Sequence, residues 1–330
     1  MSNKSIAVVT GGAGFIGSHM VDLLLSKDLE VRVIDNFSGG HERNLQHHKE
    51  NKNLIVENKS ILEITENDSI FCNVDYVFHF AGIGDIVPSI EKPSIYFETN
   101  VQGTLRVLEA SRRNNIKKLI YAASSSCYGL AETPTDENHS INPLYPYALS
   151  KYQGEQISLH WAKLYNLPVI SIRIFNAYGK RVRTTGAYGA VFGVFFKQKL
   201  EKKDFTVVGN GEQSRDFLYV TDVVEAFYAA AISNYNNEVY NLGAGNPQTI
   251  IYLTKLIGGN SVFVPKRPGE PDCTWANISK IKEHLDWIPT ISFEKGVEKM
   301  MQDISNWKDA PLWDPKSINK ATETWFRYMK

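Results

Sequence analysis

The stretch "PYALSKYQGE" places a tyrosine and a lysine one helical turn apart. Tyr147 and Lys151 are separated by four residues, so they share a face if this segment is a helix. A tyrosine with a pKa near 10 is only about 0.1% ionised at pH 7, and a nearby ammonium group favours its charged form. The pair is a candidate proton acceptor for an alcohol. The same spacing is common on helices without a chemical role, so it needs support from other parts of the chain.

A glycine-rich turn follows the first apolar run, in "VVTGGAGFIGSHMVDLLL". Gly11, Gly14 and Gly17 allow a tight turn, a close approach of backbone to pyrophosphate, and tight packing of a helix on a strand. The helix N-terminus adds N–H groups and partial positive charge. Asp35 ends the second apolar run, where a carboxylate accepts hydrogen bonds from both ribose hydroxyls and repels a 2′-phosphate. The combination predicts an NAD site rather than ordinary turn glycines, and it disfavours NADP.

A serine run, Ser124 to Ser126 in "AASSSCYG", lies between this loop and the tyrosine–lysine pair. Each hydroxyl can donate and accept a hydrogen bond, so one of them is a candidate contact to a substrate oxygen. With an oxidised nicotinamide beside Lys151, we expect the pKa of Tyr147 to fall by about 3 units, roughly 4 kcal/mol. Together the three signals indicate an oxidising site that acts on an alcohol.

Short apolar runs alternate with helical patterns through the first half of the chain. This alternation predicts an α/β fold with a Rossmann-type, doubly wound parallel sheet. We expect an NAD-binding domain over residues 1–175, to which the chain returns at about 216–243, and a smaller substrate lobe mainly over 176–330. A helix is expected to begin at Asn100, before an apolar face that includes Val101 and Leu108. The expected strands contain residues 6–9, 31–34, 53–56, 77–80, 118–121 and 169–172.

The last 24 residues hold three tryptophans, Trp307, Trp313 and Trp325. Asp314 and Pro315 stand where a helix N-cap and first turn would, and Ile318, Ala321, Thr322 and Trp325 follow with helical spacing. The pattern predicts a capped amphipathic helix that packs against the body of the protein, with a partner surface as the alternative.

The composition excludes several classes of function. Lys plus Arg and Asp plus Glu both number 36, so no overall field attracts nucleic acid or an anionic membrane, and an anionic ligand needs local cations. No run approaches the roughly 18 apolar residues of a membrane span. Cys72, Cys127 and Cys273 are odd in number and widely spaced, which suits a reducing cytosol, so we predict a cytoplasmic protein. No metal site is expected, because the pair His47-His48 lies in a polar stretch typical of a solvated loop.

The chain resembles the extended short-chain dehydrogenase/reductases of the nucleotide-sugar epimerase and dehydratase group. The matching stretches run in order from Thr10 to Lys280: "TGGAGFIG", "HFAGIGDIVPSI", "TNVQGTLRVLEA", "AASSSCYG", "PYALSKYQGE", "RIFNAYGKR", "GNGEQSRDFLYVTDVVEA", "YNLGAG" and "RPGEPDCTWANISK".

The resemblance implies a role for each motif. Ser124 would hydrogen-bond the sugar, Tyr147 would be the base, and Lys151 would assist it and hold the nicotinamide ribose. Asn241 would be structural. The cofactor residues expected on this basis are Gly11, Gly14, Phe15, Ile16, Gly17, Asp35, Asn36, Ser60, Ile61, Phe80, Ala81, Gly82, Asn100, Tyr147 and Lys151.

The two residues after Ser124 bear on the type of reaction. In this family the 4,6-dehydratases have Asp and Glu at these positions, and the decarboxylases have Glu at the second. Here they are Ser125 and Ser126, neither a strong acid nor a strong base at neutral pH. The resemblance therefore implies 4-epimerisation of a UDP-linked sugar through a transient 4-keto intermediate, closest to UDP-N-acetylhexosamine and UDP-hexuronate 4-epimerases. UDP-glucose is a further candidate substrate, and polysaccharide biosynthesis is the expected setting.

The resemblance also assigns substrate contacts. Arg215 and Arg267 would grip the diphosphate, Asn176 would contact sugar or phosphate, and the small side chain of Thr274 would admit a 2-acetamido group. The expected substrate-binding set is completed by Ser125 and Ser126. Departures from the family pattern occur at Ser60, Lys180 and Thr185.

Two alternatives stay open. One is an enzyme acting on a nucleotide sugar as a dehydratase, a dehydrogenase or an epimerase at another carbon. The other is a non-catalytic NAD-binding sensor, although such proteins usually lose the tyrosine or lysine that this chain keeps. In related proteins the helix with Tyr147 and the helix after Asn100 form a four-helix interface, so we expect a homodimer.

Overall fold

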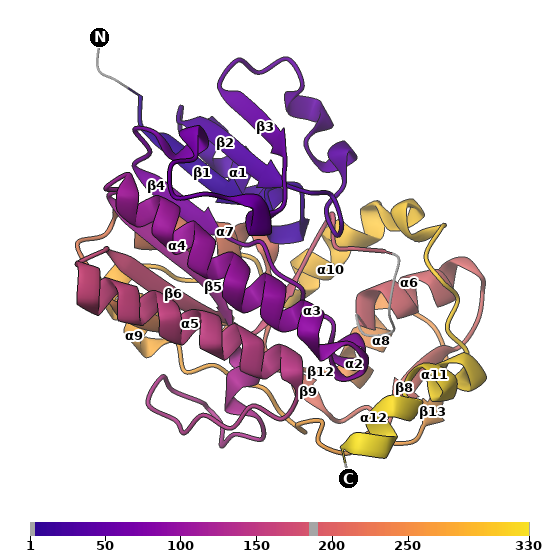
Figure 1. The fold of residues 1–330 in the computed structure, drawn as a ribbon. Helices are drawn as coiled ribbons and strands as arrows, with labels where there is room; N and C mark the ends of the chain where they lie inside the picture. The colour runs from indigo at the N-terminus through magenta and orange to yellow at the C-terminus, as the bar shows by residue number, and fades with distance from the viewer. Residues whose placement is uncertain (1–3, 185–190, 330) are drawn as a thin grey trace.

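A seven-stranded parallel sheet organises the molecule, in a computed structural model that describes residues 4–184 and 191–329 (Figure 1). Thr185 lies outside these residues. The strand order is β11-β6-β5-β4-β1-β2-β3, with the reversal beside β1 that is typical of a Rossmann-type sheet. The strands are β1 (Ile6–Thr10), β2 (Glu30–Asp35), β3 (Leu54–Asn58), β4 (Tyr76–His79), β5 (Lys118–Ser124), β6 (Val169–Ile174) and β11 (Glu238–Leu242).

Helices cover both faces of the sheet because its strands are apolar on both sides. In β1, Ala7 and Val9 belong to one core with residues of α1 (Phe15–Ser26) and α7 (Val220–Ile232). Val8 points the other way, into a second core beneath α4 (Thr104–Arg113) and α5 (Pro146–Tyr165). Figure 1 shows α4 and α5 side by side in front of the sheet. The expected Rossmann-type fold is thus present.

The helix expected to begin at Asn100 begins earlier. A continuous helical stretch runs from α3 (Pro93–Phe97) through a π-helical turn (Glu98–Gly103) into α4. Pro93 occupies the first turn, where its missing N–H costs nothing. Asn100 was misread as a cap; its buried side chain instead bonds Ser150 of α5 and the backbone of Ile83.

The segment "SRDFLYVTDVVEAFYAAA" divides between the two parts of the molecule. β10 (Phe217–Tyr219) pairs with β7 (Asn176–Tyr178), outside the large sheet. α7 then covers the sheet, and β11 joins its edge beside β6. The chain thus re-enters the sheet only after residue 219.

The remaining elements form a smaller lobe around an aromatic core. Tyr178, Phe192, Phe217 and Phe293 lie within ring contact of one another in this core. Two further strand pairs, β8 with β13 and β9 with β12, flank it. The elements are α6 (Val191–Leu200), β8 (Phe205–Val208), β9 (Ser214–Arg215), β12 (Gln248–Thr249), α8 (Ile250–Ile257), β13 (Ser261–Val264) and α10 (Phe293–Gln302). By contrast, α9 (Ser279–Leu285) packs on the core of the large sheet, to which its Ile281 belongs.

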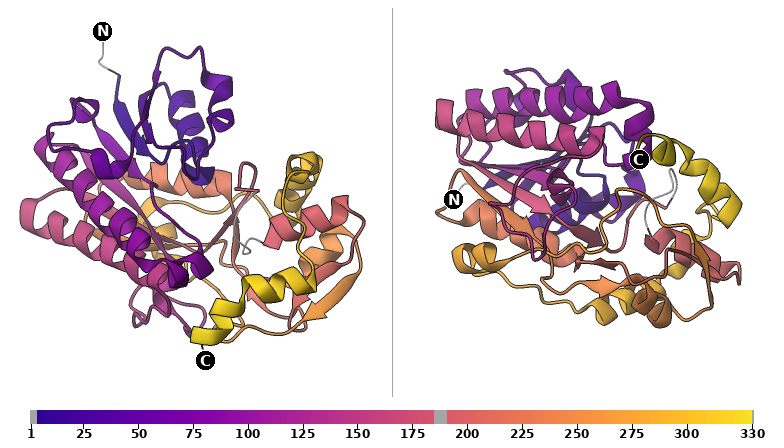
Figure 2. Two further views of the ribbon diagram at one scale, coloured as in Figure 1. Left: turned by 45° about the vertical axis from the view of Figure 1, so that its right-hand side comes forward. Right: turned by 90° about the horizontal axis from the view of Figure 1, so that it is seen from below.

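The tryptophan-rich tail packs against the body, as predicted. Trp307 and Trp325 are buried, and Asp314 caps the first of two short helices, α11 (Pro315–Ala321) and α12 (Glu323–Tyr328). The single expected helix is interrupted at Thr322. Figure 2 shows this segment running beneath the gap between the sheet unit and the smaller lobe. Among the described helices, none has the length and apolar character needed to cross a bilayer.

Candidate active site

A cavity of about 760 Å³ lies at the carboxyl ends of the sheet strands, where open α/β sheets bind ligands. Its volume is within the usual range for small-molecule sites. It brings the predicted catalytic Ser124 together with most of the predicted cofactor residues: Gly11, Gly14, Phe15, Ile16, Asp35, Asn36, Ser60, Ile61, Phe80, Ala81, Gly82, Tyr147 and Lys151. Gly17 and Asn100, which were also predicted to bind the cofactor, are not among the residues that line this cavity.

The glycine-rich loop fits a dinucleotide cradle. Gly11 has φ +70°, and a Cβ there would lie 2.7 Å from the backbone nitrogen of Ala81. A Cβ on Gly17 would lie 2.1 Å from the carbonyl oxygen of Gly11, so only glycine lets α1 pack this closely on the turn. Gly14 provides no side-chain cap for α1, which leaves the first-turn N–H groups directed at the cavity. Such a terminus suits a pyrophosphate.

The Asp35 carboxylate lies at the end of β2 on the cavity wall and is fixed by the backbone. Its Oδ2 accepts from the Ala13 N–H at 2.9 Å, and its Oδ1 accepts from the Phe37 N–H at 2.8 Å. A negative charge held in this way favours ribose hydroxyls and opposes a 2′-phosphate. Both the loop and this carboxylate therefore fit NAD.

Tyr147, Ser124 and Ser126 form a chain of hydroxyls on the wall of the cavity. The Tyr147 hydroxyl donates to Ser124 Oγ at 3.2 Å, and the Oγ atoms of Ser124 and Ser126 are 2.8 Å apart. Ser124 ends β5 and begins the 3-10 helix Ser125–Tyr128, whereas Tyr147 stands in the first turn of α5. The predicted contact between the serine run and the tyrosine is therefore present.

The predicted lowering of the Tyr147 pKa is not produced by the protein groups alone. Burial raises the pKa of Tyr147, and hydrogen bonds from the serines only partly oppose this effect. Burial also lowers the pKa of Lys151 to about 7, despite the opposing charge of Glu155, so the ammonium form is weakened at neutral pH. The Lys151 Nζ lies 4.4 Å above the Tyr121 ring, which favours the cation. The predicted fall of the Tyr147 pKa therefore depends on the positive charge of an oxidised nicotinamide.

Asn100 positions the wall of the cavity. Its Oδ1 accepts from Ile83 N–H at 2.9 Å, and its Nδ2 donates to the Ile83 carbonyl at 3.0 Å and to Ser150 Oγ at 2.9 Å. These bonds tie the loop after β4 to the turn of α5 that carries Lys151. The π-helical turn around Asn100 makes this reach possible, in keeping with the frequent occurrence of such turns at functional sites.

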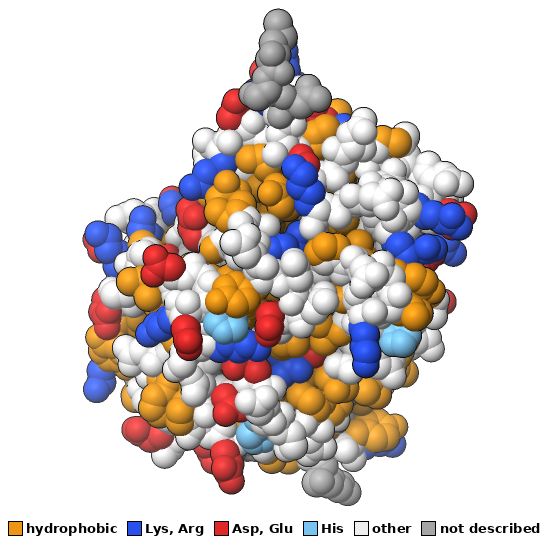
Figure 3. Space-filling model, turned by 90° about the vertical axis from the view of Figure 1, so that its left-hand side faces the viewer, with side chains coloured by type: hydrophobic (Ala, Val, Ile, Leu, Met, Phe, Trp, Pro, Cys, Tyr) orange, Lys and Arg blue, Asp and Glu red, His pale blue; other side chains and the backbone are white. Residues whose placement is uncertain are grey.

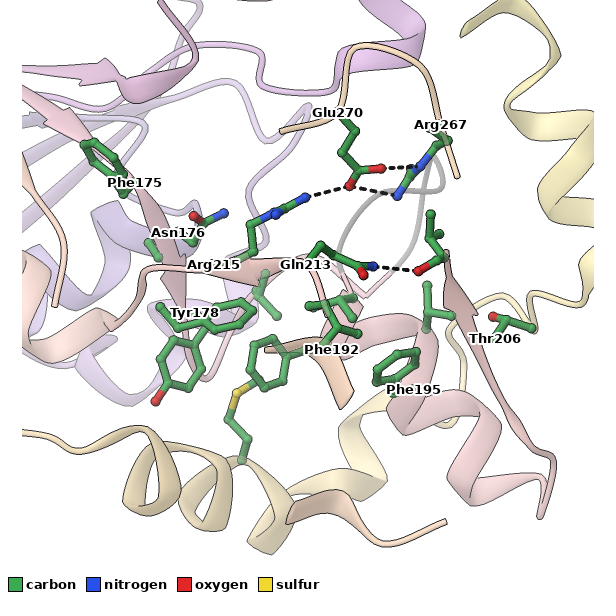
Figure 4. Close-up of a pocket in the computed structure, with 18 residues that line it drawn as sticks. Phe175, Asn176, Tyr178, Phe192, Phe195, Thr206, Gln213, Arg215, Arg267 and Glu270 are labelled. Carbon is green, nitrogen blue, oxygen red and sulfur yellow. Dashed lines mark hydrogen bonds and ion pairs between the residues drawn. The ribbon is translucent and has the colours of Figure 1, made fainter. Parts of the chain in front are cut away.

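A second cavity adjoins the first, and Phe175, Ala177 and Val182 line both. Figure 4 shows Arg215 and Arg267 approaching Glu270 from two sides. The Glu270 carboxylate lies 2.9 Å from the Arg215 Nη2 and 2.9 Å from the Arg267 Nε. The predicted diphosphate arginines thus come together from β9 and from the loop after β13, although 52 residues separate them in sequence.

The other predicted substrate residues occupy different positions. Asn176 lines the second cavity, and its Oδ1 accepts from Thr274 Oγ1 at 2.7 Å. Thr274 therefore lies behind Asn176 in the described structure, rather than on the cavity wall. Ser126 is connected to the site by the hydrogen bond between its Oγ and that of Ser124. Ser125 precedes Ser126 in the same 3-10 turn. Asn241 is buried and bonds Tyr128 and Thr135, as expected of a structural residue.

Several wall residues were missed from sequence. Thr99, Ile174 and Arg183 line the first cavity, and Glu270 lines the second. Ile174 ends β6, next to β5, so the rule that parallel strands present their carboxyl ends at one edge could have found it. Arg183 is held by both oxygens of Asp85, at 2.9 and 2.8 Å, a pairing across 98 residues that no local pattern signals.

His47 and His48, interpreted as part of a solvated loop, are exposed and half-buried, respectively. They lie in a short 3-10 helix, and their Nε2 atoms are 2.8 and 2.9 Å from Asp22 Oδ1. Arg181 contacts the same carboxylate at 2.8 Å. Burial opposes ionisation here, but hydrogen bonds from Arg181 and the histidines keep the pKa of Asp22 below its usual value. The three ligand atoms lie within 4.8 Å of one another, yet the guanidinium already supplies the cation.

Acidic and basic side chains are interspersed on the face seen in Figure 3, the left side of Figure 1. This distribution agrees with the equal numbers of acidic and basic residues in the sequence. The paired arginines of the second cavity are therefore a local feature, suited to an anionic ligand.

Solved structures similar to this one bind UDP-linked ligands. UDP-N-acetylglucosamine 4-epimerase from Methanobrevibacter ruminantium M1, in complex with UDP-N-acetylmuramic acid, has a TM-score of 0.87 and 33% identity, covering 93% of this chain and 100% of that one. UDP-glucuronic acid 4-epimerase from Bacillus cereus, in complex with UDP-glucuronic acid and NAD, has a TM-score of 0.84 and 32% identity, covering 91% and 99%.

Sequence comparison leads to the same group. A putative UDP-glucose 4-epimerase of Methanocaldococcus jannaschii is 34% identical over 307 residues, which cover 91% of this chain and 98% of that protein. UDP-glucuronic acid decarboxylases also match, at 32–33% identity. The family model described as NAD dependent epimerase/dehydratase family matches residues 7–243. The predicted family, fold and cofactor are confirmed, and the chain belongs to the NAD dependent epimerase/dehydratase family.

Proposed function

We propose that this protein is an NAD-dependent 4-epimerase of a UDP-linked sugar, acting through a transient 4-keto sugar. The observation that carries the proposal is the hydroxyl chain from Tyr147 to Ser124 and Ser126, which stands beside the fitted dinucleotide cavity without a carboxylate at positions 125 or 126. Reversible oxidation needs the tyrosine and serine. Elimination of water needs a further acid and base, which two serines do not provide.

Residues 1–175, together with about 216–243, are proposed to form the cofactor domain, and the rest of 176–330 the substrate lobe. Gly11, Gly14 and Gly17 would hold the pyrophosphate, and Asp35 the adenosine ribose. NAD held by these residues would supply reversible hydride transfer at the sugar C4, with the hydride returned to the opposite face. The full set of predicted cofactor residues belongs to this proposal.

Proton movement is assigned to the side chains of α5 and β5. Tyr147 Oη takes the proton of the sugar 4-hydroxyl as C4 is oxidised, and gives it back as C4 is reduced. Ser124 Oγ, already 3.2 Å from the tyrosine oxygen, hydrogen-bonds the same sugar oxygen. Lys151 stabilises the tyrosinate. Because burial raises the pKa of Tyr147, an additional positive charge from the oxidised nicotinamide is required for it to act as a base near pH 7.

The substrate diphosphate is proposed to bind Arg215 and Arg267. Each guanidinium has five N–H donors, so the contacts to Glu270 leave both able to bind phosphate oxygens. Asn176, steadied by Thr274, would contact the sugar from the cavity wall. Replacing Thr274 with a larger residue would displace Asn176, which offers a physical route for its proposed effect on the 2-acetamido group.

The test is conversion of three candidate substrates. The protein is incubated with UDP-N-acetylglucosamine, UDP-glucose and UDP-glucuronic acid in turn, and the anomeric protons are followed by NMR. We expect the 4-epimer of at least one, and a mixture of the same composition when the reaction starts from that epimer. No conversion of any of the three contradicts the proposal.

The same experiment distinguishes the competing reactions. Accumulation of a keto sugar indicates dehydratase activity, and NADH formed in equal amount to product indicates a dehydrogenase. Loss of the carboxylate of UDP-glucuronic acid indicates decarboxylation, the activity named for several relatives. A Tyr147→Phe variant that keeps the cellular function supports a non-catalytic NAD sensor.

We also propose a homodimer through α4 and α5, whose neighbouring positions in Figure 1 offer two helices per subunit. Leu149, Leu164 and Tyr165 of α5 are exposed and apolar, which favours burial against a second copy. Light scattering at micromolar concentration tests this, and a monomer contradicts it. Cytoplasmic location and a role in polysaccharide biosynthesis are further parts of the proposal.

A further inference from the structure

The C-terminal clasp, defined as residues 314–329 with helices α11 and α12, lies outside the region matched by the family model. Its side chains nevertheless contact α2 (Ile86–Glu91) of the sheet unit and the loop that follows β13 in the smaller lobe. In Figure 1, α12 lies between α2 of the sheet unit and the β8–β13 side of the smaller lobe. The clasp thus spans the two parts of the molecule that must hold the substrate together.

Trp325 contacts the loop that carries one predicted diphosphate arginine. Its Nε1 donates to the carbonyl oxygen of Pro268 at 2.6 Å, and the guanidinium of Arg267 lies 5.5 Å from its ring centre. Only 4% of Trp325 is exposed. A guanidinium over a buried indole is held by cation–π attraction, and the hydrogen bond fixes the backbone of the next residue. Trp325 therefore limits the directions in which Arg267 can point.

The Trp325 indole also contacts the start of α5. The Tyr145 ring lies 6.1 Å from the Trp325 ring, and it stacks on Tyr147 at 6.3 Å with 8° between the ring planes. Tyr145 is also the N-cap residue of α5. One side chain of the clasp consequently contacts both the phosphate-binding loop and the aromatic pair that includes the proposed base.

Two further contacts hold the clasp in place. Thr324 Oγ1 donates to Glu91 Oε1 of α2 at 3.0 Å, which links the clasp to the sheet unit. Met329 packs against Gly269, where an added Cβ would come within 3.0 Å of the methionine methyl group. The clasp is attached to the sheet unit at α2 and to the smaller lobe at the loop containing Pro268 and Gly269.

We propose that Trp325 is a positioning residue for UDP-sugar binding, which holds Arg267 in the orientation that grips the diphosphate. This inference rests on the proposed function for the identity of the ligand. Because a long side chain loses conformational freedom when it binds, an arginine fixed beforehand binds more tightly than one that must be ordered by the ligand. Loss of Trp325 should weaken substrate binding and leave the chemical step nearly unchanged.

The experiment uses UDP as the probe, so that binding is measured without turnover. Isothermal titration calorimetry on the NAD-loaded protein is expected to show that Trp325→Ala raises the Kd for UDP about tenfold, equivalent to about 1.4 kcal/mol. Trp325→Phe keeps a ring against Arg267 and Tyr145 but loses the bond to Pro268, so we expect a rise of about threefold. Tyr328→Ala, on the same helix but 66% exposed, is the matched control and should not change Kd.

Steady-state kinetics with the best UDP-sugar provide the second readout. For Trp325→Ala we expect KM to rise about tenfold while kcat stays within about twofold and NAD content is unchanged, although loss of a buried indole should lower the melting temperature. A purely structural role would instead lower kcat and NAD content together with the melting temperature. If Trp325→Ala does not fold, Trp325→Phe decides: a raised Kd with normal melting supports the proposal, and a Kd equal to that of the wild type overturns it.

The two proposals fail in different ways. If both Trp325 variants bind UDP more weakly and the wild-type protein converts none of the three sugars, the positioning role of Trp325 is supported and the proposed 4-epimerase activity is contradicted. Normal epimerisation with equal UDP affinity in wild type, Trp325→Ala and Tyr328→Ala overturns the clasp alone. If the wild-type protein does not bind UDP, the proposed positioning role of Trp325 is also overturned.

Discussion

The cofactor cavity and the substrate cavity, though adjacent, are built from different kinds of groups. Backbone and glycines dominate the first: Gly17 packs where a Cβ would come within 2.1 Å of a carbonyl oxygen, and Asp35 is fixed by two backbone N–H groups. The second is lined mostly by apolar side chains, and its charged groups are Arg215 and Arg267, which share Glu270. The first is rigid before any ligand binds, whereas the arginines of the second are held by ion pairs between β9 and the loop after β13.

This difference suggests a division of tasks. A rigid cradle suits a cofactor that stays bound through every cycle, because its shape need not change. Ion pairs can exchange one partner for another, which suits a substrate that enters and leaves. We therefore expect changes in the first cavity to act on folding and NAD retention, and changes in the second to act on KM.

The largest effect is expected at Tyr147, which lines the first cavity. Tyr147→Phe removes the proposed proton acceptor, so kcat should fall about a thousandfold, within the range for loss of a general base. Binding of NAD and UDP should persist, because the phenylalanine keeps the ring. Assays of epimerisation and UDP titrations measure the two quantities. The control is Tyr152→Phe on the same helix, whose kcat should match the wild type; a similar loss there would contradict the assignment.

The second largest effect is expected in the glycine-rich loop that forms the dinucleotide cradle. Gly17→Ala forces a methyl group against the Gly11 carbonyl, and overpacking of this kind costs about 3 kcal/mol of unfolding free energy. We expect most of the bound NAD to be lost as well. Gly193→Ala is a matched comparison, since Gly193 is likewise the third residue of its helix but has 3.7 Å to its nearest neighbour. Denaturant titration should find it as stable as the wild type, and equal behaviour of the two variants would contradict a special role for Gly17.

The same contrast explains what could be predicted from the sequence. Gly11, Gly14, Gly17 and Asp35 lie in one strand-turn-helix unit, so their spacing carries the information needed to place them. Tyr147 and Lys151 are likewise separated by one turn. These positions, and the sheet that supports them, follow from local periodicity together with the rules for parallel strands.

Other features depended on contacts that local sequence does not encode. Glu270 meets Arg215 across 55 residues, and Trp325 meets Pro268 across 57. The burial that raises the pKa of Tyr147 in the absence of a cofactor also depends on the folded surroundings of the side chain. Asn100 was taken for a helix cap because Asn is frequent at caps, although its side chain bonds a loop and a neighbouring helix.

Burial of Lys151 provides a pH-dependent effect of intermediate size. Its pKa is about 7 in the folded protein and near 10.5 when unfolded, so between these values the unfolded chain binds more protons and stability rises with pH. From pH 7 to 9 this group should add about 2 kcal/mol to the unfolding free energy of the nucleotide-free protein. Lys151→Met should lose that increment in urea titrations at the two pH values. Lys163→Met, exposed on the same helix, should keep it; identical pH dependence in all three proteins would show that Lys151 is not desolvated.

The smallest effect is expected in the substrate cavity, at Arg215. Arg215→Lys keeps the charge but loses the planar pair of donors that can hold two phosphate oxygens at once, so KM should rise about tenfold, or about 1.4 kcal/mol. Because the change alters no close packing, melting temperature and NAD content should stay at wild-type values, unlike those of Gly17→Ala. The exposed Arg113→Lys serves as the control, with unchanged KM. If Arg215→Lys instead released NAD or destabilised the fold, the arginine pair would be part of the rigid framework, and the contrast between the two cavities would not hold.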